Sequence, residues 1–331
     1  MLPSVSAPSR ARQSSGHGPI ACSVVKRLPD LLALVTLVAV LGALAAIPTA
    51  ATAATTTTAT TTTTAPAAPP TASRPYQVHV PPGYSPDVAA PLLLILHGYR
   101  ASGLIESFYL NLTPATDAAG MLTVAPDGTK NRQGKQFWNA TDACCNGPGA
   151  KVDDSAYLDA IIKEVEATYN VDRKRIYLVG HSNGGFMSYR MACDHADEIA
   201  ALVSLEAATY LDPRACAPSE PVATLEIHGT ADDTIPYNGG KILGRRYPGA
   251  IATTKMWAKY DGCRLVADTP APAPHDIVAN MPPATVTAYS TGCKPHGHAE
   301  LWTEEGGAHI PKLTPTFGDQ VVAYLLAHPK G

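Results

Sequence analysis

Short apolar runs alternate with longer amphipathic segments along most of this chain, and this alternation restricts the fold more than any other feature. The clearest runs have the length of a strand and occupy residues 92–96, 122–125, 176–179, 201–205 and 223–227. Residues 286–289 and 299–302 are weaker candidates. Continuous apolar runs of this length are typical of strands that are buried on both faces.

The amphipathic segments between the runs have the periodicity of helices. Residues 153–169 place Tyr157, Leu158, Ile161, Ile162, Val165 and Tyr169 on one face, with Asp153 or Asp154 as the N-cap. We expect further helices at residues 253–260 and 318–327. The alternation predicts an α/β fold in which helices cover both faces of a mostly parallel sheet. Ligands of such folds bind at the carboxyl ends of the strands.

The N-terminal region has the pattern of an export signal. Lys26 and Arg27 precede an apolar run over residues 31–47, and small residues follow at 50–54. This order favours a cleaved signal peptide within residues 1–54 and a secreted protein. The alternative is an uncleaved anchor, since a run of about 17–25 apolar residues can span a bilayer. Only in that case do we expect contact with a membrane.

Residues 55–73 are almost entirely Thr, Ala and Pro, a composition that predicts a disordered spacer. The folded domain is then expected at residues 74–331. Without residues 1–73 the formal charge is 21 minus 27, or −6, and no Lys/Arg cluster indicates a nucleic-acid groove.

The domain contains six cysteines, which predict disulfides in an exported protein. Six cysteines allow 15 connectivities. Of these possible pairs we favour Cys263 with Cys293, which would close the Pro-rich excursion over residues 270–284.

The segment Gly180-His181-Ser182-Asn183-Gly184 joins a predicted strand to a predicted helix. This is a G-x-S-x-G sequence in the context that a nucleophile elbow requires. The glycines remove side chains that would clash where the backbone doubles back, and the serine hydroxyl is exposed at a helix N-terminus. We therefore expect Ser182 to be a nucleophile and His181 to pack against the elbow.

A serine nucleophile needs a base and an acid that orients the base, and in this architecture they follow in the order acid, then histidine. Asp232 and Asp233 follow the predicted strand at 223–227, and we choose Asp232 as the acid. His309 follows the strand at 299–302 and is the expected base. His228 is expected to hold the acid loop.

Two N–H groups must stabilise the oxyanion of an acyl-transfer intermediate. We expect the first from Asn183 and the second from Tyr99, in the loop after the strand at 92–96. His296, His298 and His309 could suggest zinc, but a Gly/Pro loop explains the first two more simply. We expect no metal and no other cofactor.

Several motifs together resemble secreted feruloyl esterases and short polyhydroxybutyrate-depolymerase-like esterases. They are Leu96-His97-Gly98-Tyr99, Ala125-Pro126-Asp127-Gly128, Trp138-Asn139-Ala140 with Cys144-Cys145, Val152-Asp153-Asp154, the segment 180–187, the segment 228–237 and Gly306-Gly307-Ala308-His309. The resemblance implies an α/β-hydrolase fold and a triad of Ser182, Asp232 and His309. It also implies cleavage of carboxylic esters, often of aromatic acids on plant cell-wall sugars.

The chain departs from that family in two places. Ile310-Pro311-Lys312 stands where family members often have Thr-Trp-Pro, which bears on the lining near the acyl group. The chain ends at Gly331, with no expected carbohydrate- or polyester-binding module. Trp138 and Tyr237 are candidate substrate contacts, although Trp138 suits a core or loop anchor equally well. We expect a monomer.

Three other functions remain open at this stage. A depolymerase-like esterase would act on hydroxyalkanoate oligomers or other short polyesters rather than on plant polysaccharide. A peptidase of the same fold would cleave amides and usually has a further domain that controls access. A non-catalytic binding protein would have lost at least one position of the triad, whereas all three candidates are present.

Overall fold

The computed structural model describes residues 70–146, 149 and 151–331. The predicted signal or anchor segment and spacer residues 55–69 lie outside the described residues. Residues 70–73, which we assigned to the spacer, form a 3-10 turn, η1 (Pro70–Ser73), and Thr71 is buried there and donates a hydrogen bond to Glu164. Within the described residues, this turn is therefore packed against α3 (Asp154–Thr168). Within it, no helix is long and apolar enough to cross a membrane.

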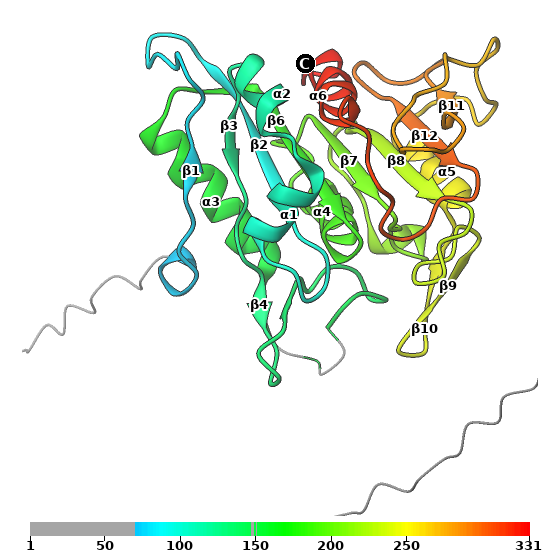
Figure 1. The fold of residues 1–331 in the computed structure, drawn as a ribbon, viewed down its shortest axis with the longest axis horizontal. Coiled ribbons are helices and arrows are strands. Elements are labelled where there is room, and N and C mark those ends of the chain that lie inside the picture. Colours follow the sequence, from blue (N-terminus) through cyan, green and yellow to red (C-terminus); the bar gives the residue numbers. More distant parts are fainter. Residues whose placement is uncertain (1–69, 147–148, 150) are drawn as a thin grey trace, which may run out of the picture. The chain divides into compact units, whose positions relative to one another are not determined.

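A mostly parallel sheet of eight strands organises the domain (Figure 1). Its strand order is β1 (Val78–His79), β3 (Leu122–Val124), β2 (Ala90–Leu96), β6 (Val171–His181), β7 (Ala201–Leu205), β8 (Ala223–Gly229), β12 (Ala299–Glu304) and β11 (Thr285–Tyr289). The strands from β3 to β12 pair in parallel, and the two edge strands β1 and β11 pair antiparallel.

The predicted strands are all confirmed, and β6 extends furthest beyond its prediction. It begins at Val171, five residues before the predicted start at 176. Residues 171–175 are partly or fully exposed, because this end of the strand extends beyond the helices that cover the sheet. A search for apolar runs therefore misses it.

Helices cover both faces of the sheet (Figure 1), as predicted. One face is covered by α3 (Asp154–Thr168), α4 (Asn183–Asp194) and α5 (Ala250–Tyr260), and the other by α1 (Gly103–Leu110), α2 (Thr113–Ala118) and α6 (Phe317–Ala327). Alternate residues of β2 enter the two cores, with Leu92 and Leu94 in the first and Leu93 and Ile95 in the second. The period of two along a strand explains why its apolar run is continuous.

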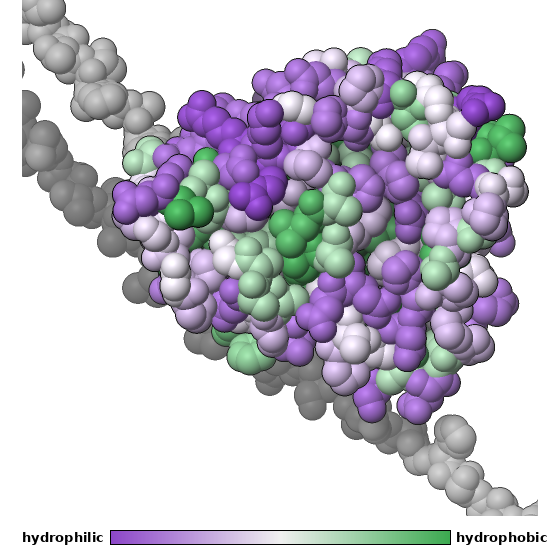
Figure 2. Space-filling model, turned by 90° about the horizontal axis from the view of Figure 1, so that it is seen from above, coloured by the Kyte–Doolittle hydropathy of each residue, from purple (hydrophilic) through white to green (hydrophobic). Residues whose placement is uncertain are grey.

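Asp153 is the N-cap of α3, with its side chain accepting a hydrogen bond from the Ala156 N–H. Helices α1 and α2 are not among the helices we predicted. They are short, and α1 exposes Leu104, Ile105 and Phe108, which obscures an amphipathic pattern. The face of the molecule seen in Figure 2 is largely hydrophilic, with apolar residues in small separate groups.

Two hairpins extend beyond the sheet, at the lower end of the view in Figure 1. They are β4 (Thr129–Lys130) with β5 (Gln136–Phe137), and β9 (Gly239–Ile242) with β10 (Arg245–Pro248). They lie at the carboxyl end of the parallel strands, because both contribute to one cavity with Ser182, which follows β6. The sequence analysis did not predict either hairpin.

The six cysteines of the domain form three disulfides. Cys263 pairs with Cys293, as predicted, and encloses the Pro-rich excursion. Cys193 pairs with Cys216, and Cys144 pairs with its neighbour Cys145. The last pair lies in the wall of the cavity beside Ser182.

Candidate active site

Ser182 occupies a sharp turn between β6 and α4. Its backbone has φ +54° and ψ −121°, a conformation that L-residues rarely adopt. A Cβ on Gly184 would lie 1.9 Å from the Leu96 carbonyl oxygen, and one on Gly180 would lie 2.2 Å from the Gly184 carbonyl oxygen. Only glycine fits at these positions, since the strand and the helix approach each other so closely. The steric basis of the predicted elbow is therefore present.

We expect the substitution Gly184→Ala to lower the free energy of unfolding by more than about 4 kcal/mol, because the new methyl group meets backbone atoms that no rotamer change can move. Urea unfolding followed by circular dichroism measures this. The control is Gly318→Ala in α6, where the nearest atom to a new Cβ would be 3.3 Å away. A Gly184→Ala protein as stable as this control would contradict the steric argument.

The structure brings together the three side chains that the sequence proposed as a triad. His309 Nε2 lies 3.0 Å from Ser182 Oγ, and His309 Nδ1 lies 2.8 Å from Asp232 Oδ2. Asp232 and His309 follow β8 and β12, so all three side chains lie at the carboxyl ends of parallel strands. Asp233 is exposed and interacts with the hydroxyl of Thr234 instead. The geometry favours Asp232 as the acid.

The surroundings of Asp232 stabilise its ionised form. Burial alone would raise its pKa, but the hydrogen bond from His309 and those from the N–H groups of Ile235 and Thr234 outweigh burial and lower the pKa below its ordinary value. A carboxylate held in this way can fix the His309 tautomer and stabilise an imidazolium.

His228 holds the acid loop, as we expected. Its Nε2 donates to the Ile235 carbonyl oxygen at 2.8 Å, and its Nδ1 lies 2.9 Å from Glu226 Oε1. Burial opposes its charged form, but the hydrogen bonds and the charges of Glu226 and Asp232 raise the pKa of His228. The hydrogen bond to Ile235 ties β8 to the loop that follows it.

Two groups of described residues have three possible metal-ligand atoms within 4.8 Å of one another: Asp159, His195 and Glu198, and Glu206, His228 and Asp232. In the second group, backbone N–H groups donate to both carboxyl groups and His228 Nε2 is bound to the Ile235 carbonyl oxygen, so these groups are engaged within the protein. His296, His298 and His309 do not form such a group in the described part of the chain.

The predicted oxyanion donors lie beside Ser182. A Cβ on Gly98 would be 3.6 Å from Ser182 Cβ, so the loop after β2 lies directly against the serine. Tyr99 and Ser182 line the same cavity. Neither the Tyr99 N–H nor the Asn183 N–H donates to another residue in the described chain, so both can bind an oxyanion.

The side chain of Trp138 is fully buried, which favours the anchor over a substrate contact. Its indole N–H donates to the His97 carbonyl oxygen, and its backbone exchanges two hydrogen bonds with the side-chain amide of Asn183. It is thus the anchor that we considered as the alternative. Tyr237 does not line the cavity at Ser182; its hydroxyl meets Thr303 and its ring packs edge-on against His228.

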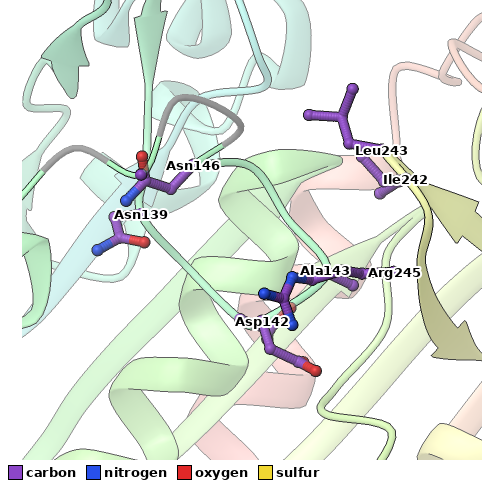
Figure 3. A pocket seen from close by; sticks show the side chains of 9 residues that line it. Asn139, Asp142, Ala143, Asn146, Ile242, Leu243 and Arg245 are labelled. Atoms are coloured by element: carbon purple, nitrogen blue, oxygen red, sulfur yellow. The ribbon is translucent and has the colours of Figure 1, made fainter.

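A cavity of about 670 Å³ opens at Ser182. Its wall is mainly apolar and includes Tyr99, Phe137, the Cys144–Cys145 disulfide, Ile235, Ile242 and Leu243. A second, polar cavity of about 370 Å³ shares Ile242 and Leu243 with the first. In Figure 3 these two side chains lie across that cavity from Asn139 and Asn146, and Asp142 and Arg245 complete the labelled polar lining.

Apart from Tyr99, the sequence analysis gave none of these lining residues a place in the site. The β9–β10 hairpin and the disulfide reach Ser182 through tertiary contacts, and no local pattern marks them. It also missed Glu106, a buried carboxyl in α1, because the exposed apolar residues of this helix hide its amphipathic pattern. The one available signal was the spacing of Glu106 and Leu110, which are four residues apart and share the buried face of the helix.

Comparison with known proteins supports these findings. A family model described as a putative esterase matches residues 70–284, more than half of the chain. Feruloyl esterase B of Piromyces equi is 34% identical over 194 residues, which cover 56% of this chain and 35% of that protein. Probable feruloyl esterase C of Aspergillus flavus is 32% identical over 183 residues, which cover 53% of this chain and 60% of that protein. The matches thus span about a third to three-fifths of these relatives.

A putative esterase, NocK, of Nocardia uniformis subsp. tsuyamanensis is 30% identical over 172 residues, or 50% of this chain and 47% of that protein. Among solved structures, an acetyl xylan esterase from Aspergillus awamori superposes with a TM-score of 0.52 at 16% identity, covering 75% of this chain and 92% of that one. Similarity at this level of identity supports the α/β-hydrolase fold.

Proposed function

This chain belongs to the family of putative esterases, and from that premise we propose that it hydrolyses carboxylic esters by acyl transfer through Ser182. The observation that supports this most directly is the continuous hydrogen-bonded row of Ser182, His309 and Asp232 beside an apolar cavity. An activated serine of this kind is the expected nucleophile for an ester carbonyl.

In the proposed mechanism, His309 Nε2 accepts the proton of Ser182 Oγ as the oxygen attacks the ester carbonyl. The N–H groups of Asn183 and Tyr99 donate to the oxyanion that forms. Asp232 accepts from His309 Nδ1 and stabilises the imidazolium, which then gives its proton to the leaving alcohol. Water repeats the sequence on the acyl-enzyme and releases the acid.

The two cavities support an ester with an apolar acyl group and a polar alcohol. Tyr99 and Phe137 give the cavity at Ser182 aromatic surface, and its volume lies in the range of small-molecule sites. The neighbouring polar cavity offers amide, carboxylate and guanidinium groups to hydroxyls. We therefore propose an aromatic or short acyl ester of a plant cell-wall sugar, a substrate class consistent with the names of the matched feruloyl and acetylxylan esterases.

A short polyester is the second candidate, because the apolar wall also suits a hydroxyalkanoate unit. We propose secretion as well. The three disulfides support it, since such bonds persist in oxidising compartments.

The test is hydrolysis by the purified protein of p-nitrophenyl acetate, p-nitrophenyl butyrate, methyl ferulate, acetylated xylan and a hydroxybutyrate oligomer, with Ser182→Ala as the blank. We expect the largest kcat/KM on the ferulate or acetyl esters. Preference for the oligomer would favour the polyester candidate. Hydrolysis of none of these esters would contradict the proposed function.

A further inference from the structure

Glu106 is a buried carboxyl whose neighbours belong to two parts of the active site. It lies in α1 and is 2% exposed. Its Oε2 accepts a hydrogen bond from the Gly98 N–H at 3.0 Å, in the loop that leads to the proposed oxyanion donor Tyr99. Its Oε1 has no hydrogen-bond partner and lies 3.7 Å from His181 Nδ1. A buried polar atom left without a partner costs about 1–3 kcal/mol, so the environment of Oε1 needs explanation.

The hydrogen bonding of His181 determines whether the nitrogen that faces Glu106 carries a hydrogen. Its Nε2 lies 2.8 Å from the carbonyl oxygen of His309, which can only accept, so Nε2 carries a hydrogen. In a neutral imidazole Nδ1 is then an acceptor, and its lone pair is directed towards Glu106. An ionised carboxylate there would bring two acceptors together. The two atoms are 3.7 Å apart, which is longer than a hydrogen bond, but a proton on Oε1 turns this contact between two acceptors into a donor–acceptor pair that a small side-chain movement can close to one.

The electrostatic environment favours this neutral arrangement. Burial raises the pKa of Glu106 to about 7, although the hydrogen bond from Gly98 opposes the rise. Burial, together with the charge of His309, lowers the pKa of His181 to about 4. A protonated Glu106 and a neutral His181 are therefore the stable pair between about pH 4 and pH 7.

We propose that a proton on Glu106 forms a hydrogen bond to His181 that couples the oxyanion loop to the catalytic histidine, which makes Glu106 a positioning residue. The link runs from the Gly98 N–H through the carboxyl of Glu106 and the ring of His181 to the carbonyl oxygen of His309. The inference rests on the proposed esterase function, since it assigns a role in holding the geometry of that same site.

Helix α1 also holds the histidine loop at a second point. The Tyr109 hydroxyl donates to the Pro311 carbonyl oxygen at 3.1 Å, and its ring lies 5.3 Å from that of His181. Other titratable groups influence the pair from further away: His309 and Asp232 act on His181, while Glu206 and Glu304 act on Tyr109. The carboxyl oxygens of Glu106 themselves lie next to the Gly98 N–H and His181 Nδ1.

A specific pH dependence follows from this arrangement. Because the coupled form has a protonated Glu106 and a neutral His181, the link is present between the two pKa values, about 4 and about 7, and is lost as the pH rises through the pKa of Glu106. We expect kcat to fall on the alkaline side for this reason. KM should change little, because Glu106 does not line the cavity at Ser182.

The decisive variant is Glu106→Gln, whose amide can accept from the Gly98 N–H and donate to His181 Nδ1 at every pH. Its kcat on p-nitrophenyl acetate at pH 6 should lie within about twofold of the wild type, and its alkaline fall should disappear. Glu106→Leu removes both hydrogen bonds, and its kcat should fall by about 10- to 100-fold.

Glu304→Gln is the matched control, because Glu304 is equally buried, its pKa is also raised by burial to about 7, and it contacts neither Gly98 nor His181. It should retain the wild-type pH profile. The proposal is overturned if Glu106→Gln keeps the wild-type alkaline fall, or loses activity at pH 6 as severely as Glu106→Leu. If Glu106→Leu fails to fold, the pH profile of Glu106→Gln still decides. Failure of the esterase function itself would be seen separately, as an inactive wild type or an active Ser182→Ala variant.

Discussion

Replacing Ser182 with alanine is expected to lower kcat for ester hydrolysis by about 10⁴-fold or more. The variant lacks the hydroxyl that lies 3.0 Å from His309 Nε2, so His309 has no serine proton to accept and no acyl-enzyme can form. The oxyanion donors and the cavity remain, so some catalysis above the background should persist. Initial rates on p-nitrophenyl acetate measure the loss.

The matched control is Ser188→Ala, six residues further along in α4. Ser188 Oγ donates to the Gly184 carbonyl oxygen within the helix and is buried, but it does not face the cavity at Ser182. We expect this control to retain kcat within about threefold, because it loses a single local hydrogen bond. An active Ser182→Ala protein, with hydrolysis comparable to the control, would show that the elbow is not the nucleophile.

Replacing Asp232 with asparagine is expected to lower kcat by about 10⁴-fold, since an amide that donates to His309 holds the imidazole in the wrong tautomer. Asp232 is suited to this role because its side chain is buried and His309 Nδ1 lies 2.8 Å from its Oδ2. The measurement compares kcat/KM of the wild type, Asp232→Asn and the control Asp233→Asn at one fixed pH.

Asp233→Asn provides the comparison for that prediction, since Asp233 is adjacent in sequence but exposed. It should stay within about twofold of the wild type, as expected for a surface substitution. Equal losses at the two positions would indicate damage to the loop rather than loss of the triad acid. A larger loss at Asp233 would reverse the assignment.

Much of the fold could be predicted from local sequence. Buried parallel strands contain unbroken apolar runs, so 201–205 was predicted at its observed bounds. The elbow could also be found, because its steric requirement is local: glycine at 180 and 184 around Ser182, between a strand and a helix. Where elements had polar or exposed ends, as at residues 171–175, the pattern gave the element but not its start.

The choice between Asp232 and Asp233 could not be made securely from sequence. Both residues follow the same strand. The triad acid is the one whose side chain turns towards His309, which lies 77 residues after Asp232 in the chain. The same holds for Trp138, whose ring suits a substrate subsite or a core equally well until its burial is known. Burial is a property of the packed domain, so the burial of a residue cannot be deduced from its position in the sequence alone.

The sequence by itself determined the class of sheet, the elbow and the order in which nucleophile, acid and base follow one another, because each can be recognised from short segments and from their order along the chain. Only the tertiary structure decided the cavity wall, the burial of Trp138 and the row from Gly98 through Glu106 and His181 to His309. These features depend on segments brought together at the carboxyl ends of the strands. Their distances and pKa values arise from that packing, since burial and hydrogen bonding set the cost of each charge.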